Sequence, residues 1–168
     1  DILDSCKNLN FLISITLDGF EEEHDKIKGK NSFKNALETY HQLINLKKMY
    51  PLLNVGISLT ISPLNQDYIL DFYEYIKTNL KPDLISPLLI RGNPILKELK
   101  NVDIEYYEKL NERIEKDLSS KEIKGYDKFL FSRIGMASRL IRNKLIANTF
   151  KDLDFFKVSA ILLVRYPE

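Results

Sequence analysis

Three segments with strand-like patterns, separated by two amphipathic helices, constrain the fold of this chain most. Residues 8–17 and 53–62 alternate apolar and polar side chains, and residues 84–91 form an almost continuous apolar run. Each connection is long enough to hold a helix, so the strands are expected to be parallel and joined by right-handed crossovers. This order predicts an α/β fold.

Capping residues and prolines mark the ends of the two intervening helices. Ser32 is predicted to be the N-cap of the first helix, which ends before Pro51. Asn65 is predicted to cap the second helix, which ends before Pro82. After residue 93 the pattern changes, and only helices are expected, the first of them starting at Asp103.

These elements divide the chain into three parts. A partial (β/α) barrel of three parallel strands with crossover helices is followed by two C-terminal helices and a short tail. The expected boundaries are 1–95 for the partial barrel, 96–154 for the helices and 155–168 for the tail.

Composition argues against several classes of protein. The 168 residues include 25 basic and 24 acidic side chains, and this near balance gives no electrostatic case for binding nucleic acid or an anionic membrane. The longest apolar run, near residues 160–164, is far shorter than the roughly 20 residues of a membrane helix. Cys6 is the single cysteine and cannot complete a cysteine-ligated metal site. With no signal-peptide pattern either, we expect a cytoplasmic, soluble protein.

Hydroxyl side chains follow the same face of two neighbouring strands. Ser14 and Thr16 lie on the first strand, and Ser58 and Thr60 on the second. Sheets of this class bind ligands at the carboxyl ends of their strands, where hydroxyls can donate to and accept from a ribose or a carboxylate. The alternative is purely structural, since Thr favours strands and Ser fills small spaces beside a helix.

Other polar residues lie just beyond the strands. Asp18-Gly19 is a turn signal. His24-Asp25 could be a base with its orienting carboxylate, although such a pair on a loop is more often ordinary polar surface. Arg91 ends the apolar third strand, where a guanidinium suits a carboxylate or phosphate, or a salt bridge to a helix. No residue is assigned a catalytic or metal-binding role.

Residues 10–93 resemble the second half of the core barrel of the radical S-adenosylmethionine (radical SAM) enzymes. In that family the fourth strand often reads apolar-Ser-apolar-Ser-Leu-Asp-Gly, followed by His-Asp-x-x-Arg-Gly and a Ser-Phe or Thr-Phe helix start. The corresponding residues are Ile13 to Gly19, His24-Asp25, Lys28-Gly29 and Ser32-Phe33. Residues 55–61, followed by Asn65, are similar to the fifth strand of the family barrel. The segment that ends at Arg91-Gly92 is similar to its sixth strand.

Two substitutions and one missing motif separate the chain from the family pattern. Thr16 replaces the commoner Ser, and Lys28 replaces the commoner Arg. The Cys-x-x-x-Cys-x-x-Cys loop that binds the [4Fe–4S] cluster in the family is absent. Because that loop follows the first strand of the family barrel, we expect the chain to be an inactive fragment of a longer parent.

The resemblance implies the function of the intact parent. It would cleave S-adenosylmethionine at a [4Fe–4S] cluster, and the 5′-deoxyadenosyl radical would abstract hydrogen from a small-molecule or peptide substrate. The cofactor would contact Ser14, Thr16, Asp18, Ser58 and Thr60, and the substrate Asn65 and Arg91. The alternatives are a non-catalytic α/β binding module or remnant, and half of an unrelated β/α barrel enzyme.

The helices after residue 93 resemble the linker to a cysteine-rich SPASM or twitch domain. That domain usually opens near Pro-Cys-x-Ala-Gly-Lys, where this chain has the apolar tail ending at Tyr166-Pro167. One hypothesis is that the tail is out of frame. The codons of residues 163–167 decide it, because some choices for them read Ala-Gly-Lys in another frame.

Overall fold

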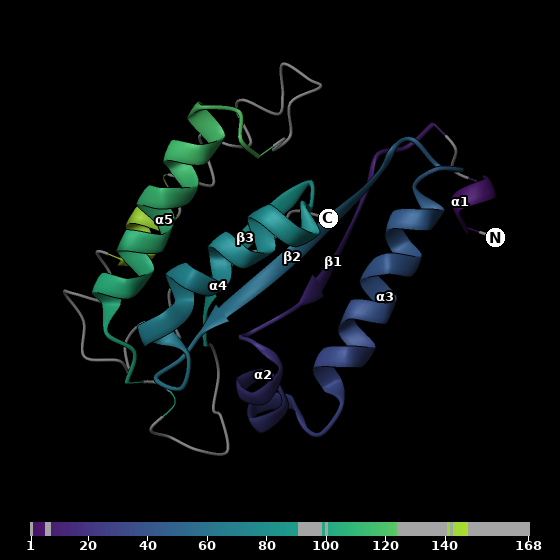
Figure 1. The fold of residues 1–168 in the computed structure, drawn as a ribbon. Helices are drawn as coiled ribbons and strands as arrows, with labels where there is room; N and C mark the ends of the chain where they lie inside the picture. The colour runs from purple at the N-terminus through teal and green to yellow at the C-terminus, as the bar shows by residue number, and fades with distance from the viewer. Residues whose placement is uncertain are drawn as a thin grey trace, which may run out of the picture.

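The computed structural model describes residues 2–5, 8–90, 99, 101–123, 141 and 143–147, and shows a mixed α/β fold around one sheet (Figure 1). The elements are α1 Ile2–Ser5, β1 Phe11–Thr16, α2 Glu21–Lys28, α3 Ser32–Leu46, β2 Leu53–Ile61, a 3₁₀ turn Gln66–Tyr68, α4 Ile69–Tyr75, a π-helical turn Ile76–Leu80, β3 Leu84–Leu89 and α5 Ile104–Ser119. Residues 141 and 143–147 are also helical.

The sheet has the order β1-β2-β3, and both strand pairs are parallel. The predicted α/β class with three parallel strands is therefore confirmed. The register places Thr16 beside Ser58, and Ser58 beside Ser86. Side chains of residues paired in this way lie on the same face of the sheet.

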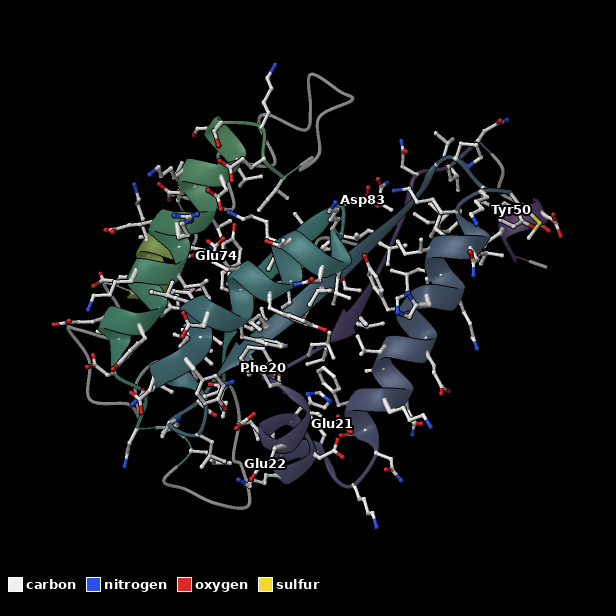
Figure 2. The ribbon with its side chains drawn as sticks, viewed as in Figure 1. Phe20, Glu21, Glu22, Tyr50, Glu74 and Asp83 are labelled. Atoms are coloured by element: carbon white, nitrogen blue, oxygen red, sulfur yellow. The ribbon has the colours of Figure 1, made fainter. Side chains whose placement is uncertain are left out.

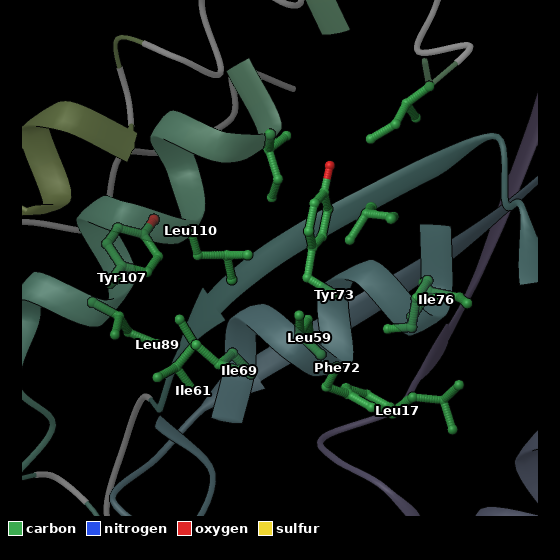
Figure 3. Packing of buried hydrophobic residues seen from close by; sticks show 14 of the residues in the cluster. Leu17, Leu59, Ile61, Ile69, Phe72, Tyr73, Ile76, Leu89, Tyr107 and Leu110 are labelled. Atoms are coloured by element: carbon green, nitrogen blue, oxygen red, sulfur yellow. The ribbon is translucent and has the colours of Figure 1, made fainter. Parts of the chain in front are cut away.

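Helices cover one face of this sheet. On β2 the side chains of Val55, Ile57, Leu59 and Ile61 are fully buried, whereas the alternate residues Asn54, Ser58 and Thr60 are only half-buried. Buried side chains of α3, α4 and α5 belong to the same core cluster as the first set, so the three helices share that face. Figure 3 shows α4 residues packed with residues of β2 in this cluster. The other face, called the open face below, contains the hydroxyl side chains.

β1 forms one edge of the sheet. Within the part of the chain that the structure describes, it pairs only with β2. Leu12 and Ile13, which point to opposite faces, are 39% and 36% exposed. This edge therefore presents both polar backbone and apolar side chains to solvent.

Several predicted boundaries are corrected. The first strand is shorter than 8–17, and the third ends at Leu89. Ser32 is the first residue of α3 and not its N-cap, which is Asn31 in a left-handed conformation with φ 64°. Asn65 precedes the 3₁₀ turn, but its side chain makes no capping hydrogen bond because it is used elsewhere.

The helices after β3 are described in part. α5 begins where predicted, with the Asp103 side chain accepting a hydrogen bond from the Glu105 N–H at 3.0 Å. Asn111 of α5 accepts a hydrogen bond from the Asn143 amide at 2.7 Å, which joins the two helical segments in the core. Most of the second helix, the tail 155–168, Cys6 and Arg91 lie outside the described residues.

Candidate polar ligand pocket

A pocket of about 460 Å³ lies at the carboxyl ends of the strands. It is bounded by the loop after β1, by α2 and by the ends of β2 and β3. The residues that line it are Asp18, Ile27, Lys28, Thr60, Ser62, Leu88, Leu89, Ile90 and Leu99. Its position is the one at which parallel α/β sheets bind ligands.

Asp18 extends the backbone ladder between β1 and β2 beyond the end of β1. The Leu17 N–H donates to the carbonyl oxygen of Ser58 at 3.0 Å. At the next hydrogen-bonding position of the ladder, the Thr60 N–H donates to Asp18 Oδ1 at 2.9 Å. The second carboxylate oxygen lies 3.2 Å from the Lys28 ammonium. Asp18 is 2% exposed but the Lys28 side chain is 43% exposed, so the positive charge of this pair faces the solvent and the pocket.

His24 holds the loop after β1 in place. The Asp18 N–H donates to His24 Nδ1 at 3.0 Å, so the neutral ring carries its proton on Nε2. The ring is buried and lies against Phe33, with 5.9 Å between the ring centroids. Burial lowers the pKa of His24; the charges of Asp18 and Asp25 oppose this shift, and that of Lys28 adds to it. The imidazole is therefore kept neutral as an acceptor.

Asp25, the neighbour of His24, caps α3. Its carboxylate accepts hydrogen bonds from the backbone N–H groups of Asn31 at 2.6 Å and Phe33 at 2.9 Å, and from the Ser32 hydroxyl at 3.0 Å. The bond from the Phe33 N–H is the largest cause of the lowered pKa of Asp25. His24 and Asp25 thus bind different partners, and the predicted alternative of a base with its orienting carboxylate has no support in this geometry.

An aromatic contact fixes α2 from the other side. Phe20, which precedes α2, packs edge-on against Phe72 of α4 with 4.9 Å between ring centroids, and lies 5.5 Å from the Tyr75 ring. Figure 2 shows the Phe20 side chain between α2 and α4. Since α2 is tied to α4 by Phe20 and to α3 by Asp25, the position of Lys28 at the pocket is defined.

Asn65 joins the ends of β1 and β2. It is fully buried; its Oδ1 accepts from the Ser62 N–H at 2.7 Å, and its Nδ2 donates to the carbonyl oxygens of Thr60, at 2.7 Å, and of Asp18. The side chain was predicted to contact substrate, but it has no exposed surface and its amide is already hydrogen-bonded. It can act on a ligand only through the loop that it positions.

The predicted hydroxyl residues Ser14, Thr16, Ser58 and Thr60 share the open face. Thr60 lines the pocket, and the other three lie further from the carboxyl edge. Ser14 pairs with Gly56, where a Cβ atom would lie 2.6 Å from the Ser14 hydroxyl, so glycine leaves room for that side chain. Within the described residues no hydrogen bond engages the hydroxyl groups of these four side chains, which leaves them available to a ligand.

One hydroxyl on this face was missed from the sequence. Ser86 of β3 pairs with Ser58 and is half-buried. It sits before Pro87 in an apolar run, which hides its alternation with the buried positions. The only sequence signal is that a polar residue stands between apolar ones at a period-two position.

Metal ligands are not gathered here. Among the described residues, no group of three or more His, Cys, Asp and Glu side chains could hold a metal ion. A [4Fe–4S] cluster takes several cysteine thiolates and the chain has one, so the residues present do not fit a cluster. The hydroxyls and the Lys28 ammonium do fit a ligand that has a ribose and a carboxylate.

The chain has no match among protein-family models, curated proteins or solved structures. Across the helices that the structure describes, none combines the length and the apolar character needed to cross a bilayer.

Proposed function

We propose that the open face and its pocket bind S-adenosylmethionine, and that this chain provides half of the barrel of a radical SAM enzyme of the SPASM-like branch. The observation that carries the proposal is the pocket at the carboxyl edge, with an exposed lysine at its rim and unengaged hydroxyls on the strands below. This arrangement supplies hydrogen-bond groups for a ribose and a cation for a carboxylate.

Each residue has a defined part in the proposal. Thr16 and Ser58 hydrogen-bond the ribose, and Lys28 pairs with the carboxylate at the rim. Asp18, His24 and Asn65 position the loop. A [4Fe–4S] cluster would supply the electron for cleavage of the cofactor, and the single cysteine of this chain could not hold it.

Binding of the cofactor to the purified chain tests the proposal. Isothermal titration with S-adenosylmethionine and S-adenosylhomocysteine should show binding, and Thr16→Val should weaken it about fivefold because one hydrogen bond is worth about 1 kcal/mol. Thr78→Val is the matched control, since Thr78 is exposed on the π-helical turn. If the wild-type chain binds neither ligand, the proposal is wrong.

The edge of β1 favours a second candidate, a non-catalytic module that binds a partner strand. The Phe11 N–H donates to the carbonyl of Leu52, just before β2, and the Leu17 N–H to that of Ser58 in β2. The alternate N–H groups of Leu12, Ser14 and Thr16 therefore point to the other edge of β1, which pairs with no other strand in the described part of the chain. An edge of this kind can pair with another strand. The second candidate would be favoured if the chain bound neither nucleoside ligand but bound an extended peptide along this edge.

A further inference from the structure

A row of three hydroxyl side chains crosses the whole sheet on its open face. Thr16 of β1 is in register with Ser58 of β2, which is in register with Ser86 of β3. We call these residues the hydroxyl row. Neighbouring strands lie about 4.8 Å apart, so the row spans roughly 10 Å, the length of a ligand with several polar groups.

The hydroxyl row continues the lining of the pocket. Thr60 and Leu88, which form the next pair toward the carboxyl edge on the same face, both line the pocket. Thr16 is exposed, and Ser58 and Ser86 are half-buried. Within the described part of the chain, no side-chain hydrogen bond involves these three hydroxyls, so each can donate to and accept from a ligand.

The open face of the strands has no charge of its own. Its positions are Leu12, Ser14, Thr16, Asn54, Gly56, Ser58, Thr60, Leu84, Ser86 and Leu88. Among the described residues that line the pocket, the charged ones are Asp18 and Lys28, which pair at its rim. A charged group placed over the row would lose water without gaining a counter-charge, whereas uncharged hydroxyl or amine groups would exchange water for the three hydroxyls.

We propose that Ser86 is a ligand-binding residue, and that the hydroxyl row binds the uncharged nucleoside part of the ligand while its charged amino-acid part stays at the rim beside Lys28. This inference rests on the proposed function, because the nucleoside is that of S-adenosylmethionine. It adds β3 to the strands that form the site. It also assigns each region a specificity, since the hydroxyl row would select uncharged nucleosides and the rim would select the amino-acid part.

The test measures the affinity of the chain for two ligands, one with the nucleoside part of the cofactor and one with its amino-acid part. Isothermal titration with 5′-methylthioadenosine, which is uncharged, and with methionine is carried out on the wild-type chain, on Ser86→Ala and on Ser86→Thr. We expect Ser86→Ala to weaken binding of 5′-methylthioadenosine about fivefold, as for the loss of one hydrogen bond. Methionine affinity should be unchanged, and Ser86→Thr should restore most of the nucleoside affinity.

Ser119→Ala is the matched control, because Ser119 lies at the end of α5 and its hydroxyl donates to the Glu115 carbonyl. It should change neither affinity. Thermal unfolding of each variant shows whether it is folded. Equal nucleoside affinity of Ser86→Ala and wild type, or an equal loss for both ligands, would overturn the inference while the proposed function stands. If the wild-type chain binds neither 5′-methylthioadenosine nor S-adenosylmethionine, the proposed function fails and this inference with it.

Discussion

Two buried aspartates, Asp18 and Asp83, have the same structural role at opposite ends of β2. At the carboxyl end, Asp18 accepts a hydrogen bond from the Thr60 N–H at 2.9 Å. At the amino end, Asp83 accepts one from the Val55 N–H at 2.9 Å. In each case a carboxylate takes the place of a backbone carbonyl that the neighbouring strand does not provide, which satisfies an N–H group at the end of the ladder.

The two ends differ in what happens to the positive charge. Lys47 hydrogen-bonds both oxygens of Asp83, its side chain is 26% exposed, and it lines no part of the pocket. Lys28 contacts one oxygen of Asp18, is 43% exposed and lines the pocket. Figure 2 shows Asp83 at the end of the sheet away from Phe20 and α2. The cation is therefore largely enclosed at one end of β2 and accessible at the other, where our proposal places the ligand.

Removing each carboxylate in turn tests this difference, and it is the largest effect that we predict. Asp83→Ala should lower the free energy of unfolding by about 3 kcal/mol, because it leaves a half-buried lysine and a buried N–H without their acceptor. Asp18→Ala should lower the free energy of unfolding by about 2 kcal/mol. The loss is smaller because Lys28, which loses its partner, is more exposed than Lys47. Urea denaturation measures both values.

Ligand binding separates the two variants. Folded Asp83→Ala should keep the wild-type affinity for S-adenosylmethionine, whereas Asp18→Ala should lose affinity because the Thr60 N–H loses its acceptor and Lys28 loses its partner, both at the pocket. Asp71→Ala, at an exposed site on α4, should change stability by less than about 0.5 kcal/mol. Equal losses of affinity in Asp83→Ala and Asp18→Ala would show that the two ends of β2 do not differ in function.

The sheet could be predicted from the sequence because alternation reports it directly. A strand with one face on a core and one face polar shows period two, and β1 and β2 both do. The same rule failed at Ser86, because β3 has apolar side chains on both faces and one serine does not reveal which face it shares with Ser58.

The candidate site could be predicted only as a set of residues. His24 and Asp25 are neighbours in the sequence, but one binds the loop after β1 and the other caps α3. Which partner each finds depends on the orientation of α2, and that is set by tertiary contacts such as Phe20 against Phe72. In the same way, the burial of Asn65 follows from the approach of two strand ends that are far apart in the sequence.

A smaller effect is expected from pH at the Asp18 end. Burial lowers the pKa of His24, so the unfolded chain takes up a proton more readily than the folded one below the ordinary value of 6.5. The contribution of neutral His24 to stability is complete above pH 6.5 and falls as the pH drops from 6.5 through the lower pKa of the folded state. The free energy of unfolding should therefore decrease between pH 7 and pH 5.

His24→Asn should abolish this dependence, since an amide oxygen can accept from the Asp18 N–H without titrating. His41→Asn is the matched control because His41, the second of the two histidines, is exposed on α3, and this variant should keep the wild-type dependence. Urea midpoints measured across this range decide the matter. An unchanged slope in His24→Asn would mean that other groups cause it.

The smallest effect on stability, and the sharpest on specificity, is expected at Lys28. Its ion pair with Asp18 is partly exposed, so Lys28→Met should cost only a few tenths of a kcal/mol in unfolding experiments. The methylene part of the side chain is kept, and Asp18 still accepts from the Thr60 N–H. The loop should therefore stay in place without its cation.

Binding then shows what the accessible charge is for. Lys28→Met should weaken binding of methionine and S-adenosylmethionine and leave 5′-methylthioadenosine unaffected, and the loss should diminish at high salt because the pair with the ligand is screened. Lys26→Met is the control. Lys26 is also on α2 and also pairs with a carboxylate, that of Glu22, but it does not line the pocket. Equal affinities in the two lysine variants would mean that Lys28, like Lys47, only neutralises an aspartate, and the contrast between the two ends of β2 would disappear.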